Sequence, residues 1–474
     1  MIALILLIAL VLRLIALNQS FWLDEAVQVW ASSSFSLADF FKLYLPGDFN
    51  PPLYHLLLHF WIKLFGTSEV SVRLLPVLLS IISIWLIWKI GLIIAGKKTA
   101  LVSALLSATS PLFIYYSQEN RMYLLSAFSV LFACWRFLAL IKNQTWKNSF
   151  SFALSLILVG FSHFLAVLVL PVFFFLGLKG IKKGKLFLPF FIFAAAYLIY
   201  LPTFLRELET GVALKNSFPI WGKTVGSFGL KSVTLLPVKF IIGRINIANK
   251  LVYGFVSLFL VFLYWGAAVL SIVETFKLSR KKQDQNLILI GWLLFFPPLI
   301  GFLISFWMPV FSYFRFLFVL PFFYLLIAVY LSNRINLLKT LFPFFVLINL
   351  ICSTTYLFNR NFHRENWRGA VNWIHAENKE SSPVIILGQT SKPFEYYDHK
   401  KSDLVIVDNP SSANLDLSVS DSSQVFLVSY SLPIFDPKDR IRGELKDLGY
   451  QLEKEKSFRQ VNLEIWALTQ QIPV

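Results

Sequence analysis

Residues 71–95 read SVRLLPVLLSIISIWLIWKIGLIIA, and this stretch decides the class of fold. Apart from Arg73 and Lys89, its side chains are apolar or small and neutral. A helix needs about 20 such residues to cross the hydrocarbon core of a bilayer. The apolar side chains run continuously instead of alternating with polar ones, which predicts a transmembrane helix and not a strand of a barrel.

Runs of the same kind recur along the chain. Hydrophobic residues make up 57% of the 474 positions and charged residues 15%, against about 25% in a soluble domain. Further predicted helices cover 99–116, 121–141, 186–204, 251–275, 287–307, 313–332 and 338–357. Because only helices and closed barrels satisfy their backbone groups in lipid, the sequence predicts an all-α polytopic membrane protein.

Lysine and arginine residues gather in short loops between these runs, a pattern that marks the cytoplasmic side. The clusters are Lys97-Lys98, Lys142 with Lys147, Lys179–Lys185, Lys277–Lys282, and Arg334 with Lys339. The net charge of +17 is therefore assigned to orientation in the membrane, and no nucleic-acid partner is expected. One basic segment, 206–249, is predicted to be external and could lie against anionic lipid.

Two further assignments complete the predicted topology. Residues 1–18 are interpreted as an uncleaved first span instead of a signal peptide, because they lack a basic start and a small-residue cleavage site. The stretch 149–180 is divided near His163 into two short spans, which keeps Lys179–Lys185 on the cytoplasmic side. Eleven spans result, with the N-terminus inside and the C-terminus outside. Cys134 and Cys352 lie in apolar segments, and no disulfide is expected.

The composition changes after residue 357, where charged residues, serine and asparagine become frequent. We therefore predict a transmembrane domain at 1–357, with a first external loop at 19–68, and a small soluble extracytoplasmic α/β domain at 358–474. Its predicted strands are Val384–Leu387, Leu404–Val407, Val425–Val428 and Leu463–Leu468, and its predicted helices are 366–378 and 438–449.

Two adjacent carboxylates, Asp24 and Glu25, follow the first span in the motif Phe21-Trp22-Leu23-Asp24-Glu25. Ionisable groups beside hydrocarbon are costly, so they are candidates for function. A carboxylate there could deprotonate an acceptor hydroxyl as a general base. The alternative is a solvated acid pair at a helix end.

The next polar motif is Asn50-Pro51-Pro52-Leu53-Tyr54-His55, whose proline pair marks the start of a helix. His55, His59 and Lys63 then recur at helical spacing on an otherwise apolar stretch. That stripe is typical of a helix lying along the membrane interface. Two histidines four residues apart could alternatively bind a metal.

Three more motifs lie on the same predicted side of the membrane. Ser117-Gln118-Glu119-Asn120-Arg121-Met122-Tyr123 fills the second external loop, where Glu119 is a further acid and Arg121 could bind a phosphate. His163 occupies the external turn of its hairpin, and Arg315 opens a late span. Glu365-Asn366-Trp367-Arg368-Gly369-Ala370 opens the outer domain, or only caps a helix there. Acids and cations beside hydrocarbon suit an amphiphilic, phosphate-bearing substrate.

These motifs resemble those of the GT-C superfamily of membrane glycosyltransferases, on the branch with protein O-mannosyltransferases and aminoarabinose transferases. The carriers are Trp22–Glu25, Asn50–Tyr54, Ser117–Tyr123, Arg315-Phe316, Leu64–Gly66 with Glu69 and Arg73–Pro76, and more weakly Trp367–Ala370. The likeness is clear over roughly 1–130 and diffuse to 357. Relatives often have histidine where this chain has Asn50, and proline where it has Met122.

The resemblance implies a polyprenyl-phosphate sugar as donor, a lipid, glycan or protein acceptor, and inversion at the sugar carbon. It implies that Asp24 is the base that activates the acceptor and that Glu119 and the arginines form the donor phosphate site. Some relatives use a divalent metal and others do not, so cofactor use is left open. The candidate residues are Asp24, Glu25 and Glu119 for catalysis, Arg121 and Arg315 for donor phosphate, and Asn50, His55, Tyr123 and His163 as further site candidates.

Two other classes of function remain open. A secondary transporter or lipid flippase would place broken helices and polar groups at the midplane, often in related halves. In this sequence the polar groups gather towards one face, and no internal repeat stands out. A membrane scaffold that binds partners through the outer domain would tolerate changes of acid to amide.

Overall fold

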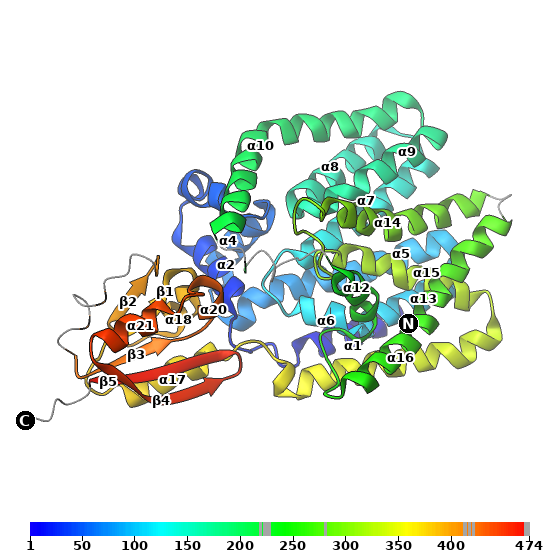
Figure 1. The fold of residues 1–474 in the computed structure, drawn as a ribbon. Coiled ribbons are helices and arrows are strands. Elements are labelled where there is room, and N and C mark those ends of the chain that lie inside the picture. The colour runs from blue at the N-terminus through cyan, green and yellow to red at the C-terminus, as the bar shows by residue number, and fades with distance from the viewer. Residues whose placement is uncertain are drawn as a thin grey trace, which may run out of the picture. The chain divides into compact units, whose positions relative to one another are not determined.

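The computed structural model describes residues 1–217, 220, 229–278, 282–410, 415, 419 and 422–468 (Figure 1). Contacts divide the chain into two compact units. The first contains Met1–Leu17, Phe35–Leu214 and Gly222–Phe362, and the second is built mainly from Asn18–Ser34 and His363–Val474. Residues 18–34 therefore pack with the C-terminal part of the chain. From the sequence, residues 19–34 were predicted to belong to the first external loop of the transmembrane domain.

The first unit is helical. Its longer elements are α1 (Ile2–Leu14), α4 (Leu53–Phe65), α5 (Glu69–Thr109), α6 (Pro111–Ser117), α7 (Tyr123–Lys142), α8 (Trp146–Ser162), α9 (Leu170–Gly180), α10 (Lys183–Ser217), α12 (Leu230–Ile242), α13 (Lys250–Leu278), α14 (Lys282–Ile304), α15 (Leu320–Ser332) and α16 (Ile335–Phe358). Short turns α3 (Leu37–Asp39), η1 (Phe40–Tyr44), η2 (Leu45–Gly47), η3 (Phe164–Val169), η4 (Leu317–Val319) and η5 (Arg360–Phe362) connect them. The predicted basic loop Lys277–Lys282 lies partly outside the described residues.

The helical path breaks where the apolar runs end. Gly96 adopts φ +83°, a left-handed conformation that glycine accepts without strain, and it separates the two halves of α5 between the predicted runs 71–95 and 99–116. The second run is not one helix, because Ser110 caps a new helix that begins at Pro111. The stretch 149–180 breaks as predicted, since α8 ends at Ser162 and η3 begins at Phe164.

A nearly all-apolar helix lies at the centre of this unit. The residues of α15 from Leu320 to Val329 are all buried, and the helix packs against α5, α13 and α14. A helix that is apolar on every side needs apolar neighbours on every side. This sequence property therefore places α15 in the core of the unit.

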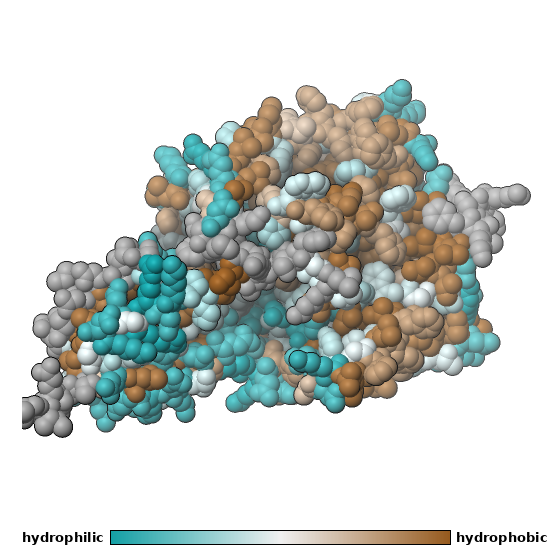
Figure 2. All heavy atoms as spheres, in the orientation of Figure 1, coloured by the Kyte–Doolittle hydropathy of each residue, from teal (hydrophilic) through white to brown (hydrophobic). Residues whose placement is uncertain are grey.

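Other helices expose apolar side chains. Examples on the surface are Phe191 and Ile199 of α10, Phe255 and Phe262 of α13, and Leu347 of α16. Figure 2 shows the resulting hydrophobic surface over the helices. Exposed apolar area of this extent requires lipid or a partner to cover it. Six helices are long and apolar enough to cross a bilayer within the described residues, and five shorter apolar helices accompany them, so the count of eleven spans stays a prediction.

The second unit combines α2 (Leu23–Ser34) with a five-stranded sheet in the order β2-β1-β3-β5-β4. The strands are β1 (Val384–Leu387), β2 (Leu404–Val407), β3 (Gln424–Val428), β4 (Tyr450–Phe458) and β5 (Val461–Leu468). β1 pairs in parallel with β2 and β3, whereas β5 pairs antiparallel with β3 and β4. The helices are α17 (Trp367–Glu377), α18 (Ser391–Tyr397), α20 (Leu432–Phe435) and α21 (Arg440–Asp447).

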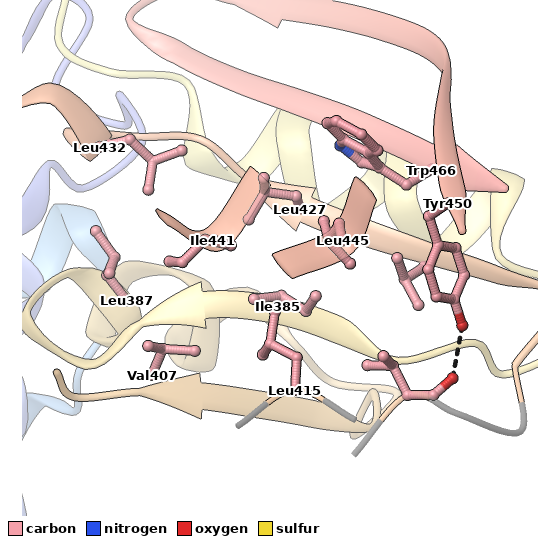
Figure 3. Close-up of a cluster of buried hydrophobic side chains, with 12 residues drawn as sticks. Ile385, Leu387, Val407, Leu415, Leu427, Leu432, Ile441, Leu445, Tyr450 and Trp466 are labelled. Carbon is pink, nitrogen blue, oxygen red and sulfur yellow. Dashed lines mark hydrogen bonds between the residues drawn. The ribbon is translucent and has the colours of Figure 1, made fainter. Parts of the chain in front are cut away.

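An apolar cluster holds this unit together (Figure 3). Ile385 and Leu427 of the central strands meet Ile441 and Leu445 of α21, and Trp466 closes the cluster from β5. At its edge the Tyr450 hydroxyl donates a hydrogen bond to the Val419 carbonyl at 2.6 Å. The predicted strands and both predicted helices are confirmed. β4 was not predicted, because most residues after Tyr450 are polar or charged, and those from Gln451 to Ser457 are exposed on both faces.

Together, an all-α membrane unit and a small C-terminal α/β unit confirm the predicted fold class.

Candidate functional site

His163 marks the most distinctive polar site of the helical unit. The residue lies between α8 and η3, is 6% exposed, and its Nδ1 accepts a hydrogen bond from the Leu165 amide at 3.1 Å. Burial, followed by the positive charges of Arg315 and Arg121, lowers the pKa of His163 from 6.5 to about 3. The ring is therefore neutral at physiological pH. The positive charges of both predicted phosphate-binding arginines therefore reach this one buried ring.

Aromatic rings lie near His163 and Arg315. The Tyr123 ring lies 6.3 Å from the His163 ring and 5.5 Å from the Phe314 ring, between ring centroids. The Arg315 guanidinium carbon lies 5.8 Å from the centre of the Phe314 ring, and its Nη1 donates to the Pro309 carbonyl at 3.0 Å. Arg315 is thus held in place by its own loop, and Phe314 lies between it and Tyr123 in this chain of contacts.

The loop that carries Glu119 and Arg121 is fixed from both sides. The Gln118 side-chain amide donates to the carbonyls of Arg13 and Ile15 at 2.9 and 2.7 Å. The Tyr54 hydroxyl donates to Asn120 Oδ1 at 2.8 Å. These bonds tie the loop to α4 and to the end of α1. Consequently the neighbouring arginine and glutamate are carried by a rigid backbone.

Glu119 itself is buried, with 1% of its side chain exposed. Arg244, which follows α12, lies within electrostatic reach of Glu119, and its guanidinium carbon is 4.9 Å from the centre of the Tyr115 ring. Arg244 is not among the site residues predicted from the sequence. Arg244 belongs to the basic segment 206–249, and the excess of positive charge in this segment was the one sequence feature that could have pointed to it.

A second acid, which the sequence analysis missed, lies just before the Asn50-Pro51-Pro52 motif. Asp48 Oδ2 is 2.7 Å from His55 Nε2, and Asp48 Oδ1 accepts hydrogen bonds from Asn50 Nδ2 at 3.0 Å and from the Phe49 amide. Burial raises the pKa of Asp48, but these bonds and the charges of His55 and Arg121 outweigh it, so the net pKa lies below the ordinary value. Asp48 therefore remains a carboxylate near Arg121.

The histidine stripe of α4 turns inward. His55 and His59 are buried, whereas Phe60 and Leu64 of the same helix are exposed. An interfacial helix would instead turn its polar face to water. Among the residues that the structure describes, no three His, Cys, Asp or Glu side chains gather as a metal site would require. His55 meets the acid Asp48.

The two adjacent acids of the first loop have different surroundings in the second unit. Both lie in the first turn of α2. The Glu25 side chain is fully buried, and its Oε2 lies 3.6 Å from Nε of the buried Arg364. Asp24 is only partly buried. Of the pair, Asp24 is the more accessible carboxylate.

A third acid meets the start of α2. Glu365 accepts hydrogen bonds from the Leu23 amide at 3.3 Å, from Trp367 Nε1 at 2.7 Å and from the Tyr430 hydroxyl at 2.7 Å. Burial is the main cause that raises the pKa of Glu365 to about 7, and the charge of Asp24 adds to the rise. From the sequence, two roles remained open for the motif that begins at Glu365: a functional role, or only the capping of a helix. Asn366 does cap α17, accepting from the Gly369 amide at 3.1 Å.

Known proteins share this fold. A sequence model of the family described as dolichyl-phosphate-mannose-protein mannosyltransferase matches residues 50–206. No curated protein matches the sequence. ArnT from Cupriavidus metallidurans, in its crystal structure bound to undecaprenyl phosphate, superposes with a TM-score of 0.59 and 12% identity, covering 98% of this chain and 97% of its own.

An archaeal enzyme superposes comparably. The oligosaccharyltransferase AglB from Archaeoglobus fulgidus, in complex with an inhibitory peptide and a dolichol-phosphate, has a TM-score of 0.55 and 14% identity, covering 100% of this chain and 75% of its own. The same oligosaccharyltransferase in complex with Zn and sulfate has a TM-score of 0.54 and 14% identity, with 96% and 72% coverage. The chain is therefore a multi-pass membrane protein with the fold of the GT-C superfamily of glycosyltransferases, and the resemblance drawn from its motifs is confirmed.

Proposed function

We propose that this protein transfers a sugar from a polyprenyl-phosphate-linked donor to a hydroxyl or amine acceptor on the outer side of the membrane. The acceptor atom attacks the anomeric carbon as the bond from that carbon to the phosphate oxygen breaks. The acceptor proton passes to a base, the configuration of the sugar carbon inverts, and the polyprenyl phosphate leaves with the electron pair of the broken bond.

The observation that carries this proposal is the pair of arginines around neutral His163. A leaving phosphate gains negative charge in the transition state, and fixed cations that face it lower the barrier. Arg121 and Arg315 supply two guanidinium groups, and both act on one buried ring. A guanidinium binds phosphate through two parallel hydrogen bonds. The exposed apolar helix surfaces of the same unit suit a donor whose lipid chain stays in the bilayer.

We assign the general base to Asp24. It is partly exposed, and the neighbouring Glu25 is committed to Arg364. We therefore give Glu25 a structural role instead of the catalytic one expected from the sequence. Glu119, beside Arg244, and Asp48, beside Arg121, are proposed to orient these arginines and to balance their charge.

Comparative lipid analysis tests this function. Cells that lack the gene should accumulate one polyprenyl-phosphate sugar and lose one glycosylated product, which mass spectrometry of extracted lipids and glycans would detect. Restoring wild-type protein should reverse both changes, and restoring the Asp24→Asn variant should reverse neither. A flippase would leave the donor pool intact but shift it across the membrane. A scaffold would be restored equally well by the Asn variant.

A further inference from the structure

The segment that carries Asp24 is bound throughout by residues that lie more than 300 positions later in the chain. The Arg364 amide donates to Gln19 Oε1 at 3.1 Å, and the Arg368 amide donates to Ser20 Oγ at 3.1 Å. The Phe21 amide donates to the Tyr397 hydroxyl at 2.8 Å. Residues 19–21 are thus held immediately before α2 begins.

Glu365 completes this attachment at the first residue of α2. Its Oε2 accepts the Leu23 amide, which is one of the amide groups that a helix start leaves without an intrahelical partner. A carboxylate at this end also interacts favourably with the helix dipole. Trp367 Nε1 and the Tyr430 hydroxyl hold the carboxylate from the other side. One fixed side chain therefore sets the position of the peptide that leads into Asp24.

We infer that Glu365 is a positioning residue for Asp24, through which the C-terminal α/β unit sets the geometry of the general base. This inference rests on the proposed function. Glu365 itself does not touch substrate in this scheme. Glu365 fixes the first residue of α2, next to Asp24, and when ionised it places a second negative charge near Asp24.

The charge of Glu365 should also affect the pH dependence of the rate, which a purely structural role would not. The groups that face Glu365 are Asp24 and the Leu23 amide of α2, Trp367 of α17 and Tyr430 after β3, with the Glu25–Arg364 ion pair nearby. Like charges raise one another's pKa. Because the pKa of Glu365 is about 7, Glu365 becomes charged only as the pH rises through neutrality, and that charge should make Asp24 a stronger base. The rate should therefore rise near pH 7 in the wild type, and Glu365→Gln should lack that rise.

The chain offers a matched control. Glu464 accepts a hydrogen bond from Trp466 Nε1 at 3.0 Å, just as Glu365 does from Trp367, and both carboxylates are nearly fully buried. Glu464 binds Arg442 of α21 at 2.6 Å and makes no contact with α2 that the structure describes. Glu464→Gln therefore disturbs the same unit without disturbing the support of Asp24.

The experiment compares purified wild-type protein with Glu365→Gln and Glu464→Gln. In Glu365→Gln we expect kcat to fall by about 10- to 100-fold, as displacement of a reacting group commonly causes, with donor KM unchanged and the rise of the rate near pH 7 lost. Glu464→Gln should keep both kcat per folded molecule and the pH profile. Wild-type kcat and pH profile in Glu365→Gln, or an equal loss in both variants, would overturn the inference.

Hydrogen exchange separates this inference from the proposed function, because it needs no turnover. The amides of Phe21 and Leu23 should be protected in the wild type and in Glu464→Gln, and Leu23 should exchange at least about tenfold faster in Glu365→Leu, whose side chain has no acceptor for it. Unchanged protection at Leu23 overturns the inference even if sugar transfer is established. If Glu365→Gln does not fold, Tyr430→Phe, which removes one donor to Glu365, should give smaller changes of the same sign, and no change in it would count against the inference.

Discussion

At the scale of single residues, the sequence revealed groups whose chemistry is unusual for their surroundings. Asp24, Arg121 and Arg315 are charged residues at the ends of apolar runs, so the cost of burying charge pointed to them. Asp48 was not predicted, and Glu365 was named only as the start of a motif, because the contacts that place them beside Arg121 and the Leu23 amide join residues distant in sequence. Pairing at long range depends on the fold and leaves no local pattern.

Arg315→Lys should weaken donor binding or slow transfer, because an ammonium cannot form two parallel hydrogen bonds to phosphate. Loss of binding would appear as a higher KM, and loss of leaving-group stabilisation as a lower kcat. The alternative is that Arg315 only anchors the helix end, which lysine does equally well. Unchanged kcat and KM in the lysine variant would remove Arg315 from the site.

Glu25→Gln should destabilise the second unit and leave the chemistry intact. Removing one partner of a buried ion pair typically costs about 3–5 kcal/mol, because the other charge stays buried and uncompensated. Thermal unfolding of the purified variant should show a clearly lower Tm, with kcat per folded molecule near the wild-type value. A stable variant with abolished kcat would instead return Glu25 to the catalytic site.

At the scale of elements, the composition of the runs predicted where helices break. Gly96 and His163 interrupt α5 and the α8–η3 connection where the sequence indicated ends of spans. Pro111 starts a new helix inside a run that looked continuous, because hydropathy does not register the missing amide of proline. β4 was missed for the opposite reason, since an exposed edge strand needs no apolar alternation.

The break at His163 gives a pH-dependent stability. The pKa of His163 is about 3 in the folded protein and 6.5 in the unfolded chain, so below about pH 6.5 the unfolded state binds the extra proton. Stability should therefore fall as the pH drops from 7 towards 5. Tm measured in detergent should fall less in His163→Gln, whose amide can still accept the Leu165 amide. Equal falls in both proteins would contradict the burial of a neutral imidazole.

At the scale of the whole molecule, the sequence predicted a membrane domain followed by a small α/β domain, and the fold confirms both. It did not predict that residues 18–34 join the C-terminal part. Hydropathy marks the first loop as polar but carries no information about the surface on which it folds.

The charge pattern predicts which parts face outwards. The chain has two cysteines, both buried, so a background of Cys134→Ala and Cys352→Ala is free of reactive thiols. Single cysteines are then placed at the exposed positions Lys97, in a basic loop, and Lys400, in the α/β unit. A membrane-impermeant thiol reagent added to intact cells should label the 400 probe and not the 97 probe. The reverse labelling would place the α/β unit in the cytoplasm.

The central claim is that this protein breaks a sugar–phosphate bond with Asp24 as base, and one measurement addresses it directly. Purified protein is incubated with a panel of undecaprenyl-phosphate sugars and candidate acceptors, and released undecaprenyl phosphate is quantified by mass spectrometry. Wild-type protein should release it from one donor with formation of an inverted glycoside, and Asp24→Asn should be slower by about 10²- to 10⁴-fold while remaining folded. Near-wild-type release by folded Asp24→Asn would contradict the assignment of the base, and transport of donor without any release would contradict the transferase itself.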